Sequence, residues 1–336
     1  MSKPPFQKLH GAKKALVIAT TICTFATLPL AAQEAATNFL DVLSVQQRLQ
    51  SGGSGGQLLP QPVNLVIEDV GGSFRIASAG KLRMLSQRTT MAASNYVAGV
   101  APEETLVIFT KAKAEFRLIL NALVKGDESI GIIGPESQRR TLEAVARVEA
   151  LFAPFEAALD GILAGTDIDK NIAYIAENND ALLAEANVLT SEVSAAYSNP
   201  AEMTQAAAMH VDISARQRML TQRIAKQAAG VAIGNKALGS VEGLAKTMAL
   251  YETSLNALLN GMPEAGINPP PTEELRLKLT EAVVGWSKTK VVLDQLIQTG
   301  TASNATQVEI MNLMNAELDK MIVIAKLYTE HAKTRI

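Results

Sequence analysis

Two arginines and a glutamine form a short pattern that occurs twice in the sequence, at a constant spacing of 135 residues. The pattern consists of Arg83, Gln87 and Arg88 in the first copy and of Arg218, Gln222 and Arg223 in the second. A guanidinium offers paired N–H donors in a planar fork, which suits carboxylates and small oxyanions. A duplicated pair of arginines within a helical pattern therefore indicates anion recognition as the chemistry to test first.

The composition excludes several other kinds of site. The only cysteine, Cys23, lies in a segment that we expect to be removed, which excludes disulfides, thiolate metal sites and covalent c-type haem. Histidines occur singly, and the sequence has neither a Glu-x-x-His pattern nor a glycine-rich phosphate loop. We predict no catalytic residue, no metal site and no cofactor, and a noncovalent haem is the alternative left open.

The N-terminus has the features of a secretory signal peptide. Four lysines precede an uncharged apolar run over residues 15–28, and the small residues Ala31 and Ala32 follow. We predict cleavage after Ala32 and a periplasmic location, and an uncleaved membrane anchor is the alternative. Without the segment the chain has 27 basic and 33 acidic residues, a net charge of −6. This balance, with no basic patch larger than a helix face, argues against nucleic acid as a partner.

The chain beyond residue 64 consists of two copies of one unit. With an offset of 135 and no gaps, Leu120–Leu123 matches Leu255–Leu258. The helix breakers match in the same register, which predicts equal helix lengths. The matching pairs are Gly126 with Gly261, Gly131 with Gly266, Pro135 with Pro270 and Gly165 with Gly300.

The predicted fold class is all-α, with two tandem up-down four-helix bundles and an internal repeat of 135 residues. We predict a signal peptide over 1–32, a flexible tether over 33–64, and bundles over 65–199 and 200–336. The first helix of each bundle carries the arginine pattern, and leucine and methionine seams of helical period predict the cores. Prolines are expected in the first turn of each third helix, and Pro200 is expected to break the helix at Asn199.

The helical period separates the two arginines of each copy. With Leu220 at zero and about 100° per residue, Arg218 lies near 160° and Gln222 near 200°, away from the core of their own bundle. Arg223 lies near 300°, beside the core stripe of Ile224, Ala228 and Val231. We therefore expect Arg223, like Arg88, to have a structural role and to pair within its own bundle.

Two interpretations of the outward-facing Arg83 and Arg218 remain open. In one they are ordinary solvated surface residues. In the other, two first helices pack side by side, in one chain or across a homodimer, and the arginines meet over a small anion. The second interpretation gains weight because Arg83 and Arg218 are retained while Met91 aligns with Lys226 and Asn95 with Gly230, at positions taken as exposed.

Gly80–Arg88 and Ala215–Arg223 resemble the conserved motif of the PilJ-type domain, the N-terminal module of type IV pili methyl-accepting chemotaxis transducers. The motif is also similar to the first-helix motif of nitrate/nitrite sensor kinases of the NarX/NarQ kind. The resemblance implies a periplasmic four-helix sensor module in which the Arg before Met, here Arg83 and Arg218, holds the anion. Gln87 and Gln222 stand where the nitrate sensors have Tyr, so the resemblance favours the PilJ type.

The resemblance implies a sensory protein rather than an enzyme. We expect Arg83, Gln87, Arg218 and Gln222 to bind a small oxyanion such as nitrate or nitrite. The chain ends without a kinase or methyl-accepting domain, so the partner is expected to be a membrane-bound receptor or chemosensory protein. The alternative is a protein-interaction module of a pilus or chemosensory system that binds no small ligand.

Overall fold

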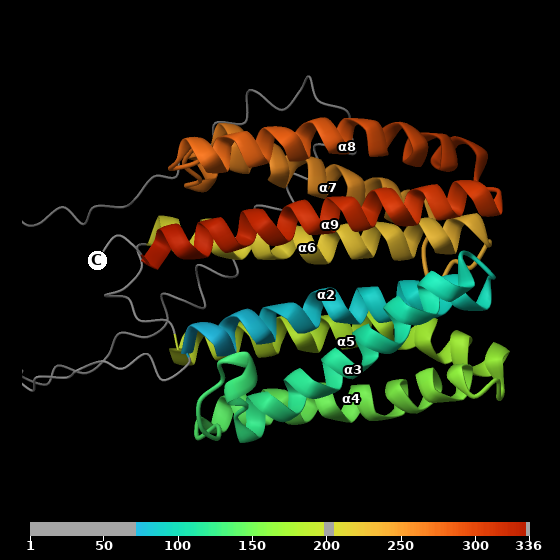
Figure 1. Ribbon diagram of the computed structural model, residues 1–336, viewed down its shortest axis with the longest axis horizontal. Coiled ribbons are helices and arrows are strands. Elements are labelled where there is room, and N and C mark those ends of the chain that lie inside the picture. The colour runs from blue at the N-terminus through green and yellow to red at the C-terminus, as the bar shows by residue number, and fades with distance from the viewer. Residues whose placement is uncertain (1–71, 198–204, 334–336) are drawn as a thin grey trace, which may run out of the picture.

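In the computed structural model, the described residues 72–197 and 205–333 form two antiparallel four-helix bundles with no strand among them (Figure 1). The first bundle consists of α2 (Gly72–Val97), α3 (Pro102–Lys125), α4 (Arg139–Leu163) and α5 (Ile168–Tyr197). The second consists of α6 (Gln205–Ala232), α7 (Val241–Asn260), α8 (Glu273–Thr299) and α9 (Asn304–Lys333). The predicted all-α fold is confirmed. The predicted signal peptide, tether and break at Asn199 lie outside the described residues.

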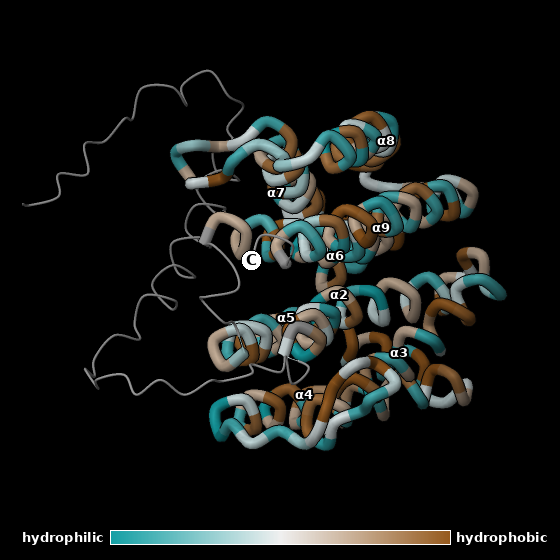
Figure 2. The backbone as a smooth tube through the Cα atoms, turned by 60° about the vertical axis from the view of Figure 1, so that its left-hand side comes forward, coloured by the Kyte–Doolittle hydropathy of each residue, from teal (hydrophilic) through white to brown (hydrophobic). Residues whose placement is uncertain are grey.

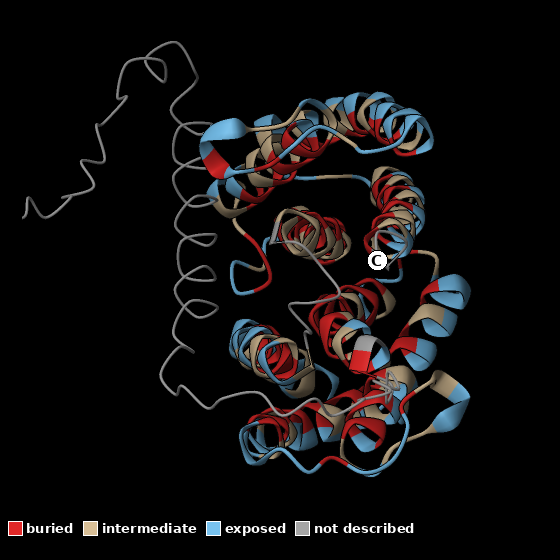
Figure 3. Ribbon diagram, turned by 90° about the vertical axis from the view of Figure 1, so that its left-hand side faces the viewer, coloured by how far each residue is buried: buried red, intermediate tan, exposed pale blue. Residues whose placement is uncertain are grey.

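Seams of helical period supply the core of each bundle, because residues three and four apart share one face of a helix. Apolar residues occur along the helices of both bundles (Figure 2), and buried positions line the inner faces of both sets of helices (Figure 3). The predicted seam of α9 is buried throughout; its members are Met311, Met314, Leu318, Met321, Ala325 and Tyr328.

Glycines end the second helix of each bundle in the same way. Gly126 and Gly261 follow α3 and α7, and both have φ 80°, a left-handed conformation that favours glycine. A tight turn with a short 3-10 helix follows in each bundle, η2 (Glu128–Ile130) or η3 (Pro263–Ala265). The matching turns explain why the two copies align without gaps.

The third helices begin later than expected. Pro135 and Pro270 were expected in the first turn, but α4 begins at Arg139 and α8 at Glu273. That expectation is wrong because both prolines lie before the first residue of the helix that follows. The hydroxyl of Thr272 accepts a hydrogen bond from the backbone N–H of Leu275 and caps α8. The prolines therefore belong to the connecting loops.

The two bundles pack side by side rather than end to end. The first helices, α2 and α6, lie next to each other and run in the same direction (Figure 1). Helix α5 lies beside α2 and α9 lies beside α6 in the two inner layers, and the remaining helices lie on the outer sides. Helices α2 and α6 are therefore covered on two sides, by their own bundle and by the other. From Leu82 to Asn95, every residue except Arg88 is buried. The two copies of the arginine pattern thus face each other within one chain.

Candidate functional site

Arg83 projects from α2 toward the second bundle. Its guanidinium lies 3.5 Å from the carboxylate of Asp212 on α6, and its side chain is only 4% exposed. Burial lowers the pKa of Arg83 to about 10, and the positive charges of Arg216 and Arg218 act in the same direction against the attraction of Asp212. The interpretation of Arg83 as a solvated surface residue is therefore wrong. The second bundle covers it and three other charges surround it.

Arg218, the matching residue of α6, is partly buried and lacks a carboxylate partner among the described residues. No hydrogen-bond partner lies beside its Nε atom. Burial alone lowers the pKa of its guanidinium, with no nearby carboxylate to offset the effect. A desolvated cation without a counter-charge is unfavourable. Arg218 is therefore the group at this interface with the greatest need of an anion.

The carboxylate that pairs with Arg83 belongs to the second copy alone. Asp212 occupies the position that Ala77 has in the first copy. Its second oxygen lies 2.8 Å from Arg216, so one carboxylate serves two guanidinium groups. Arg218 adds a third positive charge near Arg83 at the facing surfaces of α2 and α6. The site keeps a surplus of positive charge where water is largely excluded.

Arg88 and Arg223 were expected to pair within their own bundles, and this expectation is wrong. Arg88 of α2 donates hydrogen bonds at 2.9 Å to the side-chain oxygens of Gln222 and Asn315, both in the second bundle. Arg223 of α6 lies 4.0 Å from Asp180 of the first bundle. Asp180 and Asn315 match at the 135-residue offset, so the two contacts form a symmetric exchange between bundles.

The two glutamines make hydrogen bonds one turn beyond the arginines. The Nε2 atom of Gln87 donates to Asn179 of α5 at 3.2 Å, and its oxygen has no partner among the described residues. Gln222 accepts the hydrogen bond from Arg88. Both side chains are fully buried. In this conformation the two amides support the packing of the bundles, and their contact with an anion stays a prediction.

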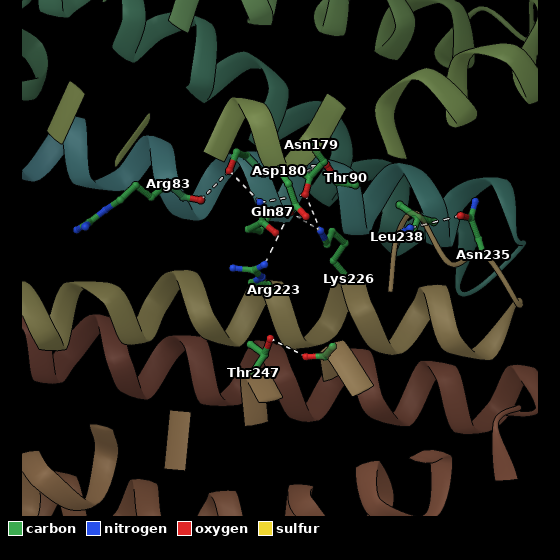
Figure 4. Close-up of polar contacts among 12 residues, drawn as sticks. Arg83, Gln87, Thr90, Asn179, Asp180, Arg223, Lys226, Asn235, Leu238 and Thr247 are labelled. Atoms are coloured by element: carbon green, nitrogen blue, oxygen red, sulfur yellow. Dashed lines mark hydrogen bonds and ion pairs between the residues drawn. The ribbon is translucent and has the colours of Figure 1, made fainter. Parts of the chain in front are cut away.

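Sequence reasoning missed a polar cluster at the same interface. Lys226 donates to Asn179 at 2.6 Å and to Asp180 at 3.3 Å, from α6 to α5 (Figure 4). Lys226 is 1% exposed and its counterpart Met91 is fully buried, so the view of these positions as exposed is wrong. The repeat could have indicated this cluster, because Asn179 matches Met314 in the second copy just as Lys226 matches Met91. Two polar residues at these positions thus correspond to two methionines at the matching positions.

The two helices that carry the arginine pattern lie within segments that match one protein family. A family model, PilJ, described as the N-terminal part of type IV pili methyl-accepting chemotaxis transducers, matches residues 70–185 and 201–309. The chain belongs to the PilJ family. Each matched segment begins before a first helix; the first extends into α5 and the second reaches the start of α9.

The PilJ family is a sensory family of chemotaxis transducers rather than a family of enzymes. Membership therefore indicates a signalling role and a link to membrane or chemosensory proteins. No curated protein matches the chain. Within the described residues, none of the helices combines the length and the apolar character needed to cross a membrane.

Proposed function

We propose that this PilJ protein is a periplasmic sensor of a small oxyanion, with nitrate and nitrite as first candidates. The anion binds between α2 and α6, held by Arg83 and Arg218, and the bound state is passed to a membrane-bound receptor. The observation that carries the proposal is the partly buried Arg218, whose guanidinium has no carboxylate partner among the described residues while Arg83 and Arg216 add further positive charge.

An anion at this place would stabilise the contact between the bundles. Arg83 and Arg218 repel each other in the absence of an anion, and this repulsion opposes close packing of α2 against α6. A planar oxyanion can accept hydrogen bonds from both guanidinium groups and bring them together. Binding would thus favour one relative position of the two helices, which is how a ligand shifts a conformational equilibrium.

Isothermal titration of the purified protein with nitrate and nitrite tests the proposal. Each charge-assisted hydrogen bond contributes about 1.5–3 kcal/mol, which predicts binding in the micromolar-to-millimolar range. Arg218→Ala should weaken binding at least tenfold. Arg276→Ala is the matched control, because Arg276 is an exposed arginine that pairs with Glu273 on the outer helix α8. Absence of heat with both anions, or equal binding by both variants, would remove the proposal.

The proposed location depends on the N-terminal segment. We propose that residues 1–32 direct export and that residues 33–64 tether the bundles. Cell fractionation and N-terminal sequencing of the exported protein test this directly. A mature N-terminus at Gln33 supports the proposal, and retention of the full segment in the membrane would support the alternative of an uncleaved anchor.

A second candidate function is protein interaction without a small ligand, and a surface of α8 favours it. Leu277, Val284 and Val291 recur every seven residues and are 54%, 52% and 68% exposed. Such spacing places them in one line along the outer face of the helix. The burial of Arg83 argues against the arginines as the partner's contact. Capture of a chemosensory partner that Val284→Lys abolishes and Arg218→Ala leaves intact would favour this function.

A further inference from the structure

The interior of the second bundle contains a polar layer that the first bundle lacks. Each of its four helices contributes one side chain: Gln217 from α6, Tyr251 from α7, Trp286 from α8 and Glu317 from α9, all at most 2% exposed. At the offset of 135 the first bundle has Leu82, Phe116, Leu151 and Leu182. Four matched positions thus have hydrogen-bonding residues in the second bundle and apolar residues in the first.

Tyr251 connects the members of this polar layer. Its backbone carbonyl accepts a hydrogen bond from Gln217 at 3.3 Å, and its ring lies 4.6 Å from that of Trp286. Its hydroxyl donates to Glu317 at 3.3 Å. Because Tyr251 contacts the other three residues, the layer is one connected cluster rather than four separate polar side chains.

The charge in the layer is balanced. Lys320, one turn along α9, lies 2.6 Å from the carboxylate of Glu317. Gly285 makes room for this pair, since a Cβ atom there would lie 1.9 Å from Nζ of Lys320 and 2.4 Å from Oε1 of Glu317. The matching residue of the first bundle is Ala150. The backbone is therefore adapted to hold a carboxylate inside the bundle.

Two polar atoms of the layer have no partner among the described residues: Nε1 of Trp286 and Oε1 of Gln217. A buried donor or acceptor without a partner is costly, and native proteins rarely leave one unpaired. One atom donates and the other accepts. An ion would fit poorly, because an anion would meet Glu317 and a cation would meet Lys320.

We propose that the polar layer is an internal binding site for a small uncharged molecule that both accepts and donates a hydrogen bond. Water is the smallest such molecule and a primary amide is the simplest organic one. The guest accepts from Trp286 and donates to Gln217. This site is separate from the anion site, although Gln217 directly precedes Arg218 on α6.

The fluorescence of Trp286 reports on this site, because Trp286 is the only tryptophan of the chain. The probe is acetamide, and N,N-dimethylacetamide, which lacks the N–H group, is the control compound. A saturable change in emission with acetamide alone supports an organic guest. If neither compound gives a saturable change, a high-resolution crystal structure decides: ordered solvent at hydrogen-bond distance from both atoms supports water as the guest. Bare atoms in that structure would overturn the proposal.

A stability measurement gives an independent answer. Gln217→Met keeps the shape of the side chain and removes the acceptor. If a guest is bound, the Tm should fall by about 2–4 °C, because a satisfied hydrogen bond is lost. A rise in Tm would mean that the oxygen is bare and would overturn the proposal. If Gln217→Met folds poorly, Gln217→Leu replaces it in this measurement, because leucine is the matching residue of the first copy. Gln227→Met is the matched control, since Gln227 is a buried glutamine of α6 that lies nearly three turns from the layer.

Discussion

The two bundles share one backbone plan but differ in how they fill it. The first has an aromatic interior in which Phe116 and Phe152 stack with ring centroids 4.0 Å apart. The second has Tyr251 at the position of Phe116 and surrounds it with polar groups. The two copies thus share the order of helices and the turns, while at this level of the interior the second has hydrogen-bonding groups where the first has apolar side chains.

A second difference lies at the start of the first helices. Arg75 donates to the carbonyl of Ile133 at 3.1 Å and ties α2 to the loop before α4. The matching residue of the second copy is His210, whose Nε2 atom lies 2.7 Å from the carbonyl of Asn268. Ile133 and Asn268 also match at the offset of 135. The two residues thus make the same contact with different chemistry, which indicates that the position of the loop was retained.

The largest effect, on the free energy of unfolding, is expected when a buried carboxylate is introduced at the matching position of the first bundle. Leu182→Glu places a charge opposite Phe116, which has no hydroxyl, and beside Glu185 in place of Lys320. An uncompensated buried charge costs about 3–5 kcal/mol, which urea unfolding followed by circular dichroism would measure. The reciprocal Glu317→Leu should cost much less. Equal losses for both variants would show that the two interiors do not differ in this respect.

The next effect concerns the interface. Lys226→Met removes a buried ammonium that donates hydrogen bonds to Asn179 and Asp180. The free energy of unfolding should therefore fall by about 1.5–3 kcal/mol. The double variant with Asn179→Met has methionine at both positions, as in the other copy, and should recover part of the lost free energy of unfolding. A double-mutant cycle should give a coupling of about 0.5–3 kcal/mol. Additive losses would contradict the view that the two positions changed together.

A smaller effect, on the affinity for nitrate, is expected when the second copy is given the residue of the first copy beside the arginines. Asp212→Ala gives the second copy the residue of the first and removes the carboxylate that competes for Arg83. Nitrate should then bind about tenfold more tightly, which corresponds to about 1.4 kcal/mol. Asp180→Ala, which removes an exposed carboxylate beside Arg223, is the matched control and should leave the affinity unchanged. Weaker binding by Asp212→Ala would mean that Asp212 positions the arginines rather than competes.

The smallest effect is a dependence of stability on pH. Burial raises the pKa of Glu317 above its ordinary value of 4.5, although Lys320 and Tyr251 oppose the shift. A carboxyl whose pKa is higher in the folded state binds more protons there, so stability should fall as the pH rises above 4.5 through the folded pKa. Glu317→Gln should flatten this part of the curve of Tm against pH. An unchanged slope would show that other groups cause it.

Much of the fold could be predicted from the sequence because its signals are local. Matching breakers such as Gly126 and Gly261 fixed the helix ends, and the seams of α5 and α9 identified the buried faces. The period also separated Arg218 from the core of its own bundle. These features depend on residues close together in the chain, so no knowledge of the packing between bundles was needed.

The partners of the site residues could not be predicted in the same way. A helical wheel places Arg88 relative to its own bundle, whereas its bonds go to Gln222 and Asn315 across the interface. The burial of Lys226 likewise depends on the packing of α6 against the first bundle. A residue-by-residue comparison of the two copies could have indicated these contacts, because differences such as Ala77 in the first copy and Asp212 in the second occur where the bundles meet.

The order of two residues on α6 has a consequence for regulation. Gln217 points into the second bundle and Arg218 follows it immediately at the interface, so no hinge separates the proposed interior site from the proposed anion site. Any rotation or sliding of that turn moves both side chains together. The two binding equilibria would then be linked, and linkage is reciprocal: a guest that raises the affinity for the anion must itself be bound more tightly when the anion is present.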